Sequence, residues 1–331
     1  MGCRAARAGR ARAGQRSGRD HTGASRVAIA LLASALATPA YAERQTFRTV
    51  SVEEGLSQLV VDAMTFDTDG YLWIGTQAGL NRFDGQLVAS LGSAEGLRHN
   101  HVTTLAADPR GGLWVGTDEG LQHLHDETFT DVALDTAPAV AVRTLHVGPD
   151  GRIWVADERG LYVGDGRTFT RITDIEGADV MRVLVDRQGT AWVASLTGLW
   201  RVVDHAVVRV EGAPAMLRTE YVTEDGSGRL WVATVEGVHV REHERWVPEL
   251  TAQLNQASPG QKFLLYFDRR GELWLGDAGG VGLWAGGKLR RFGSADGLRL
   301  SSVASVVEDP EGRVWLGGFG GVAGFVGRAF T

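Results

Sequence analysis

The sequence predicts an all-β protein, a seven-bladed β-propeller built from four-stranded antiparallel blades. Three observations lead to this prediction. A motif centred on tryptophan recurs seven times with spacings of 38 to 43 residues. Glycine stands three residues before and six residues after every one of these tryptophans. Between the glycines lie short apolar runs that alternate with polar residues, which is typical of β-strands joined by tight turns. The seven tryptophans are Trp73, Trp114, Trp154, Trp192, Trp231, Trp274 and Trp315.

Each position of the motif has a physical interpretation. Aspartate stands six residues before the tryptophan in six copies, and only the third copy has Gly148 there. A carboxylate at this place can accept hydrogen bonds from the amides of a hairpin turn, and the glycine that follows can adopt positive φ. The residue two after each tryptophan is glycine or alanine. We expect this small residue to leave room for a bulky neighbour on the same strand face.

The apolar runs predict four strands in each copy of about 40 residues. In the second copy these strands are expected at His101–Ala107, Leu113–Gly116, Leu121–His125 and Phe129–Leu134. Four strands in a unit of this length are typical of a propeller blade. A ring of blades leaves no open end, whereas a linear stack does.

The two ends of the repeat region predict how the ring closes. Phe47–Val50 precedes the first copy and has the position of a fourth strand without its own blade. The sequence stops at Thr331, where the fourth strand of the last copy should begin. We therefore expect the N-terminal strand to complete the seventh blade.

The first 42 residues differ from the rest and predict a secretory signal peptide. They contain seven arginines and one acid, then the apolar run Val27–Ala37 and the small residues before Glu43. This order of regions is typical of a signal peptide, and the apolar run is too short for a membrane-spanning helix. The alternative is a disordered basic tail. The predicted organisation is thus a signal peptide at 1–42 and a propeller at 43–331, located in the periplasm and not integral to a membrane.

The composition of residues 43–331 excludes several functions. They contain 27 basic and 39 acidic residues, a formal net charge of −12, so binding to nucleic acid is not expected. The only cysteine, Cys3, lies in the predicted signal peptide. The remaining chain therefore has no disulfide, no thiolate nucleophile and no cysteine metal site.

Residues 55–86 resemble the two-component regulator propeller repeat. The first copy reads DTDGYLWIGTQAGLNRFDG around Trp73, and the other copies keep its central part. The resemblance implies a periplasmic sensor domain of a hybrid histidine kinase or diguanylate cyclase. It also implies a small-molecule ligand, in this family often carbohydrate-related, and a sensor kinase or cyclase as partner. The sequence shows no kinase histidine box, no GGDEF stretch and no later membrane helix. We therefore expect a sensor module that lacks its own output domain.

The candidate ligand-binding residues lie in two sets of loops that propellers place on one face. These loops precede each first strand or join the second and third strands. Polar residues that vary between copies are expected to form the site, although each could also be a solvated loop tip. The predicted ligand-binding residues are Gln58, Gln77, His99, Asn100, Glu119, Glu158, Arg159, Glu236 and Arg299.

No catalytic residue, metal site or cofactor is predicted. The histidine pairs at residues 99 and 101 and at residues 123 and 125 lack a third ligand at a fixed spacing, so exposed strand positions are favoured over a metal site. Two alternatives to a non-catalytic sensor stay open. One is a propeller lyase resembling streptogramin lyase, which has a related repeat, or a glycosidase. The other is a scaffold for protein–protein interaction.

Overall fold

The computed structural model describes residues 47–173, 180–213, 218–243, 245–250, 264–277 and 279–326. Every described residue belongs to the second of two units of the chain, Ala42–Thr331. The predicted signal peptide at 1–42 lies outside the described residues. No helix in the described part of the chain has the length and apolar character needed to cross a membrane.

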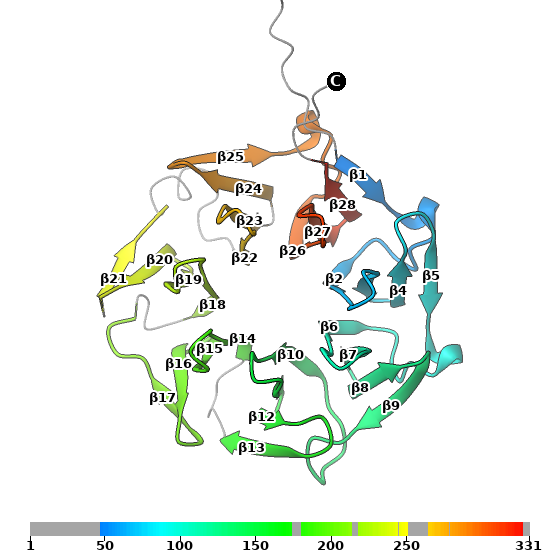
Figure 1. Ribbon diagram of the computed structural model, residues 1–331, viewed down its shortest axis with the longest axis horizontal. Helices are drawn as coiled ribbons and strands as arrows, with labels where there is room; N and C mark the ends of the chain where they lie inside the picture. The colour runs from blue at the N-terminus through cyan, green and yellow to red at the C-terminus, as the bar shows by residue number, and fades with distance from the viewer. Residues whose placement is uncertain are drawn as a thin grey trace, which may run out of the picture. The chain divides into compact units, whose positions relative to one another are not determined.

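The second unit is a seven-bladed β-propeller, as predicted. Seven separate sheets each contain four antiparallel strands. The first strand of each blade contacts the first strands of the two neighbouring blades, so these strands surround the central axis (Figure 1). In six of the blades the later strands follow outward in chain order, whereas the outermost strand of the seventh is the N-terminal strand.

The strand bounds are as follows for the first four blades. Blade 1 consists of β2 (Val61–Phe66), β3 (Leu72–Thr76), β4 (Gly79–Phe83) and β5 (Val88–Leu91). Blade 2 consists of β6 (Val102–Ala107), β7 (Leu113–Thr117), β8 (Gly120–His125) and β9 (Thr128–Val132). Blade 3 consists of β10 (Val142–Val147), β11 (Ile153–Asp157), β12 (Gly160–Gly164) and β13 (Phe169–Thr173). Blade 4 consists of β14 (Val180–Val185), β15 (Ala191–Ser195), β16 (Gly198–Val203) and β17 (Ala206–Arg209).

The last three blades complete the ring. Blade 5 consists of β18 (Thr219–Glu224), β19 (Leu230–Thr234), β20 (Gly237–Glu242) and β21 (Arg245–Pro248). Blade 6 consists of β22 (Leu264–Phe267), β23 (Leu273–Asp277), β24 (Gly280–Ala285) and β25 (Lys288–Phe292). Blade 7 consists of β26 (Ser302–Glu308), β27 (Val314–Phe319), β28 (Gly321–Phe325) and β1 (Phe47–Val50).

The N-terminal strand closes the ring, which confirms the prediction. β1 pairs antiparallel with β28, with Phe47 opposite Phe325 and Val50 opposite Val322 (Figure 1). Three strands of blade 7 therefore come from the C-terminal end and the fourth comes from the N-terminal end.

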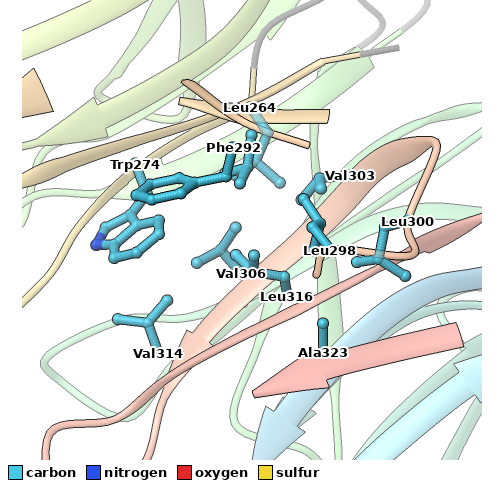
Figure 2. Close-up of a cluster of buried hydrophobic side chains, with 11 residues drawn as sticks. Leu264, Trp274, Phe292, Leu298, Leu300, Val303, Val306, Val314, Leu316 and Ala323 are labelled. Atoms are coloured by element: carbon cyan, nitrogen blue, oxygen red, sulfur yellow. The ribbon is translucent and has the colours of Figure 1, made fainter. Parts of the chain in front are cut away.

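The core lies between neighbouring blades rather than in one central mass. Figure 2 shows the cluster between blades 6 and 7, where Trp274 and Phe292 of blade 6 face Val306, Val314 and Leu316 of blade 7. Each interface has its own cluster of buried side chains of this kind. Trp200, Trp246 and Trp284, which lie outside the repeat, pack against such clusters from the outer strands.

The small residue two positions after the tryptophan lies close to side chains of other strands. A Cβ atom added at Gly75 would lie 2.6 Å from Val102 Cγ1, and one at Gly317 would lie 2.7 Å from Val61 Cγ1. These valines begin the first strand of the next blade. At Gly75 and Gly317 the space left by the small residue is therefore filled by the adjacent blade, whereas at Gly116 the nearest atom is Cγ2 of Thr104 in the same blade, at 2.5 Å.

Three connections between blades share a short 3-10 helix. These helices are η1 (Val52–Glu54), η2 (Ser93–Glu95) and η3 (Ser294–Asp296). In each, an acidic side chain accepts a hydrogen bond from the backbone N–H of the residue preceding the helix, at 2.7 to 3.1 Å. The turn then ends at a glycine with φ between 85° and 106°. These caps give three loops beside the candidate site a common backbone path.

Candidate functional site

All nine predicted ligand-binding residues lie on one face of the propeller. Each first strand is antiparallel to its second strand, so the start of the first strand lies beside the turn between the second and third strands. We call this end, formed by those turns and by the connections between blades, the loop face. The other end carries the turns that open with aspartate, and we call it the Asp-turn face.

Four of the predicted residues come from blade 1 and from the connections that lead to blades 1 and 2. Gln58 is half-buried, and its Oε1 is buried without a hydrogen-bond partner among the described residues. Gln77 is exposed in the turn between β3 and β4. His99 accepts a hydrogen bond from the N–H of His101 at 3.2 Å, and Asn100 accepts one from the N–H of Ser93 at 3.1 Å. His99 and Asn100 thus shape the loop before β6.

The remaining residues are distributed around the same face. Glu119 and Glu236 are exposed in the turns of blades 2 and 5. Glu158 pairs with Arg143 of β10 at 2.9 Å. Arg299 is exposed after η3 and contributes to the low pKa of Glu54, behind the larger effect of the Ser51 hydrogen bonds. Of the nine predicted residues, Arg159 alone lines the cavity between blades 2 and 3.

That cavity lies on the loop face between blades 2 and 3 and has a volume of about 240 Å³. The loop that joins β9 to β10 forms one wall, and the turns of blades 2 and 3 form the others. Its charged lining residues are Arg98, Asp131, Asp135, Asp157 and Arg159. We call it the loop-face pocket.

Arg159 is held in the pocket by two carboxylates. Its guanidinium lies 3.5 Å from Asp157 and 3.8 Å from Asp135. Asp157 is buried and accepts hydrogen bonds from the backbone N–H groups of Arg159 at 2.7 Å and Gly160 at 3.0 Å. The Nε atom of Arg159 is buried and has no hydrogen-bond partner within the described ranges. Such a donor normally finds an acceptor in a folded protein or in its ligand.

A hydrogen bond from the Tyr162 hydroxyl orients the carboxylate of Asp135. Tyr162 donates to Asp135 at 2.9 Å. The N–H of Ala137 and this hydroxyl lower the pKa of Asp135, so Asp135 is a carboxylate at neutral pH. Burial, followed by the Asp135 hydrogen bond, raises the pKa of Tyr162 to about 12. The wall of the pocket is therefore rigid and charged.

On the other side of the pocket, Arg98 is held by blade 2. It contacts Asp131 at 2.7 Å, and the buried Gln122 donates to the second oxygen of Asp131 at 2.9 Å. Gln122 also accepts from the backbone N–H of Arg98 at 2.8 Å. The two arginines thus lie in one pocket, each supported by a carboxylate. This arrangement suits a polar ligand that carries hydrogen-bond acceptors.

The sequence analysis missed the carboxylates that orient these arginines. For Asp157, the sequence contains a clue in the residue type found three positions after each tryptophan. Four copies have threonine or serine there, whereas the third copy has Asp157 and the sixth has Asp277. Asp131 and Asp135 gave no signal, because they lie in a strand end and a connection that no other copy shares.

The prediction that both histidine pairs occupy exposed strand positions is wrong. His101 is half-buried, with Nδ1 2.8 Å from Asp118 and Nε2 3.2 Å from Asp62. The ring of His123 packs against that of Trp114 at a tilt of 37°, with ring centroids 4.2 Å apart, and of these four histidines only His125 is exposed. In the part of the chain that the structure describes, no group of three or more histidine, cysteine or acidic residues could hold a metal ion.

Known proteins resemble this chain in both sequence and fold. Residues 55–78 and 96–119 match the family described as two component regulator propeller. The extracellular domain of the hybrid two component system BT3049 from B. thetaiotaomicron matches with a TM-score of 0.70 and 19% identity. This match covers 85% of the present chain and 41% of that one. No curated protein matches in sequence.

Two further solved structures show the range of proteins that share the fold. The extracellular domain of the hybrid system BT4673 from the same organism matches with a TM-score of 0.71 and 19% identity, over 85% of this chain and 39% of that one. An inactive variant of virginiamycin B lyase from Staphylococcus aureus, with quinupristin, matches with a TM-score of 0.66 and 11% identity, over 84% and 97%. At these identities the likeness shows the fold, and the chain spans about two fifths of the extracellular domains.

The repeat match lies within the seven-bladed architecture. The two matched segments contain the turns and tryptophan strands of blades 1 and 2, and the other blades repeat the same strand pattern. The chain is therefore a seven-bladed β-propeller in which two segments, residues 55–78 and 96–119, match the two component regulator propeller repeat.

Proposed function

We propose that this chain is the ligand-binding sensor propeller of a bacterial two-component signalling system, that it acts in the periplasm and that it is not itself an enzyme. Its similarity to extracellular domains of such systems supports the signalling role. The observation that carries ligand binding is Arg159 at the wall of the loop-face pocket, because its buried Nε has no acceptor among the described residues. Binding residues carried by loops on a rigid scaffold are typical of this kind of fold.

The chemistry of the pocket limits the ligand. Arg98 and Arg159 present guanidinium N–H groups, and three aspartates present acceptors within the same cavity of about 240 Å³. A small polar molecule with both acceptors and hydroxyl or amine donors can satisfy these groups. Since the two arginines already have carboxylate partners, the pocket does not require an anion.

A binding screen with an arginine variant tests the proposal. We would screen the purified chain against a library of small polar metabolites by thermal shift, and measure the affinity of each ligand found by calorimetry. Replacement of Arg159 by methionine is expected to weaken binding at least tenfold, about 1.4 kcal/mol, because it removes the unpaired donor. The matched control is Arg152→Met, because Arg152 is exposed on the Asp-turn face. A ligand that binds both variants equally well would contradict this assignment.

The lyase alternative has its own experiment, because a lyase propeller shares the fold. We expect no change in the chromatographic retention or fragment-ion pattern of quinupristin after incubation with the chain and Mg²⁺, and no new product from any ligand of the screen. Turnover in either case would show that the chain is an enzyme.

Export is tested by the mass of the protein from the periplasm of an expressing bacterium. We expect the mature chain to begin at Glu43, because the small residues before it form the predicted cleavage site. A cytoplasmic product that retains residues 1–42 would contradict the periplasmic assignment.

A further inference from the structure

The axial channel of the propeller is a second cavity, separate from the loop-face pocket. The first strands of all seven blades line it, and its volume is about 490 Å³. Hydroxyl groups are frequent in its lining, and two tyrosines contribute rings. The hydroxyl-bearing lining residues are Thr65, Thr103, Thr104, Thr144, Tyr221, Tyr266 and Ser305.

Arg182 of β14 is the unusual residue in this channel. Its guanidinium carbon lies 4.6 Å from the centroid of the Tyr221 ring, and the side chain is half-buried. No acidic residue in the described part of the chain forms an ion pair with it. Arg143, the other arginine of the lining, pairs with Glu158 at 2.9 Å. A partly buried guanidinium without a counter-charge is costly, and a cation–π contact offsets only part of this cost.

The other titratable groups of the lining leave this charge uncompensated. The single lining carboxylate, Asp62, lies 3.2 Å from His101 of blade 2. Burial, and secondarily the positive charge of Arg182, lowers the pKa of His146 to about 4, so His146 is neutral at pH 7. Burial raises the pKa of Tyr266, so its hydroxyl stays protonated. The channel therefore holds one positive charge, on Arg182, without an acidic partner among the described residues.

From these contacts we infer that the axial channel binds a small organic monocarboxylate, with its carboxylate on Arg182. A guanidinium and a carboxylate match in shape and form two parallel hydrogen bonds. The rings of Tyr221 and Tyr266 offer an apolar surface for the body of such a ligand, and the hydroxyls accept or donate to its polar groups. A phosphate dianion suits the channel less well, because its second charge would need a second free cation, and the other arginine of the lining, Arg143, is already paired with Glu158.

The test uses benzoate as the probe, with benzamide and inorganic phosphate for comparison. Calorimetry with the full chain at pH 7 is expected to show saturable binding of benzoate. Benzamide has the same shape without the charge, and phosphate has more charge without the ring, so both are expected to bind at least tenfold more weakly. Binding of benzamide or phosphate as tight as that of benzoate would overturn the proposal, and so would the absence of saturable benzoate binding.

Variants locate the site. Arg182→Gln is expected to weaken benzoate binding at least tenfold, whereas Arg182→Lys, which keeps the charge, is expected to recover part of it. Arg152→Gln is the matched control, because this exposed arginine lies outside the channel lining. Circular dichroism and thermal unfolding confirm that each variant is folded. If Arg182→Gln binds benzoate like the original chain, the proposal is wrong.

This inference does not rest on the sensor function. The loop-face pocket is tested by Arg159→Met and the channel by Arg182→Gln, and the two cavities share no lining residue. A failure of one test therefore leaves the other intact.

Discussion

At the residue scale, the aspartate and tryptophan of the repeat are joined by a hydrogen bond. The indole N–H of Trp73 donates to Asp67 at 2.6 Å, and the same bond is present in blades 4, 5, 6 and 7 at 2.8 to 3.1 Å. The other carboxylate oxygen accepts from the amides of the turn, as in Asp67 with Asp69 and Tyr71. One aspartate thus fixes both the turn and the tryptophan between blades.

Two blades lack this bond, for different reasons. In blade 2, Asp108 pairs instead with Arg110 at 3.0 Å and with His123 at 3.1 Å, and the indole N–H of Trp114 has no partner among the described residues. In blade 3 the aspartate is replaced by Gly148, and the indole N–H of Trp154 is likewise without a partner there. The sequence predicted the turn hydrogen bonds of the aspartate. It gave no sign of the indole bond, because two residues six apart become neighbours only through the hairpin.

Replacing Gly148 with aspartate should therefore stabilise the protein. The new carboxylate can accept from the Trp154 indole and is expected to add about 1 kcal/mol to the free energy of unfolding. A Cβ atom at this position meets the end of the Asp150 side chain at 2.8 Å, which can move aside. Urea unfolding measures the effect.

Gly148→Ala is the control for this change, since it adds the Cβ atom and removes the flexibility of glycine without adding an acceptor. Equal stability of the alanine and aspartate variants would show that the indole bond contributes nothing.

At the element scale, β1 has a special role because it joins the two ends of the chain. Phe47 contacts Phe325 of β28 and Phe292 of blade 6, with ring centroids 5.5 and 5.9 Å apart. Phe325 in turn contacts Trp274 at 5.1 Å. The strand therefore completes blade 7 by backbone pairing and fastens it to blade 6 by aromatic packing.

Phe47→Ala is expected to open the ring locally. The loss of a half-buried aromatic side chain at this place should cost about 2–3 kcal/mol. Because β1 pairs with a strand from the other end of the chain, hydrogen exchange should accelerate in β1 and β28 well before the other blades.

The matched control is Phe169→Ala, because Phe169 is also half-buried in an outer strand but belongs to a blade with all four strands in sequence. If both variants changed exchange only in their own strand, β1 would have no special part in closure.

At the scale of the whole molecule, the fold could be predicted because every blade repeats the same information. The seven copies of the glycine–tryptophan–glycine motif indicated the number of blades. The predicted strand bounds are also close, since the strand expected at Leu121–His125 is observed at Gly120–His125. The site could not be predicted in the same way. Asp135 and Arg182 have no counterpart in the other copies, and their roles depend on which blades the ring places side by side.

The channel histidine predicts how the stability of the whole propeller depends on pH. The pKa of His146 is about 4 in the folded protein and about 6.5 in an unfolded chain, mainly because burial disfavours the charged ring. Below pH 6.5 the unfolded chain therefore takes up a proton that the folded protein does not, and the free energy of unfolding falls until pH 4. The pKa values of His123 and His239 are also lowered by burial and act in the same direction.

We therefore expect the propeller to lose stability between pH 7.5 and pH 5, with His146 contributing at most about 2 kcal/mol. The low pKa of Asp225, about 2, does not oppose this loss, because that carboxylate stabilises the fold until the pH falls below about 3.9. Urea unfolding at the two pH values measures the effect. His146→Gln should lose less stability than the original chain, whereas His205→Asn, in the exposed turn between β16 and β17, should behave like the original chain. Parallel behaviour of His146→Gln and the original chain would show that the acid sensitivity of the propeller arises outside its channel.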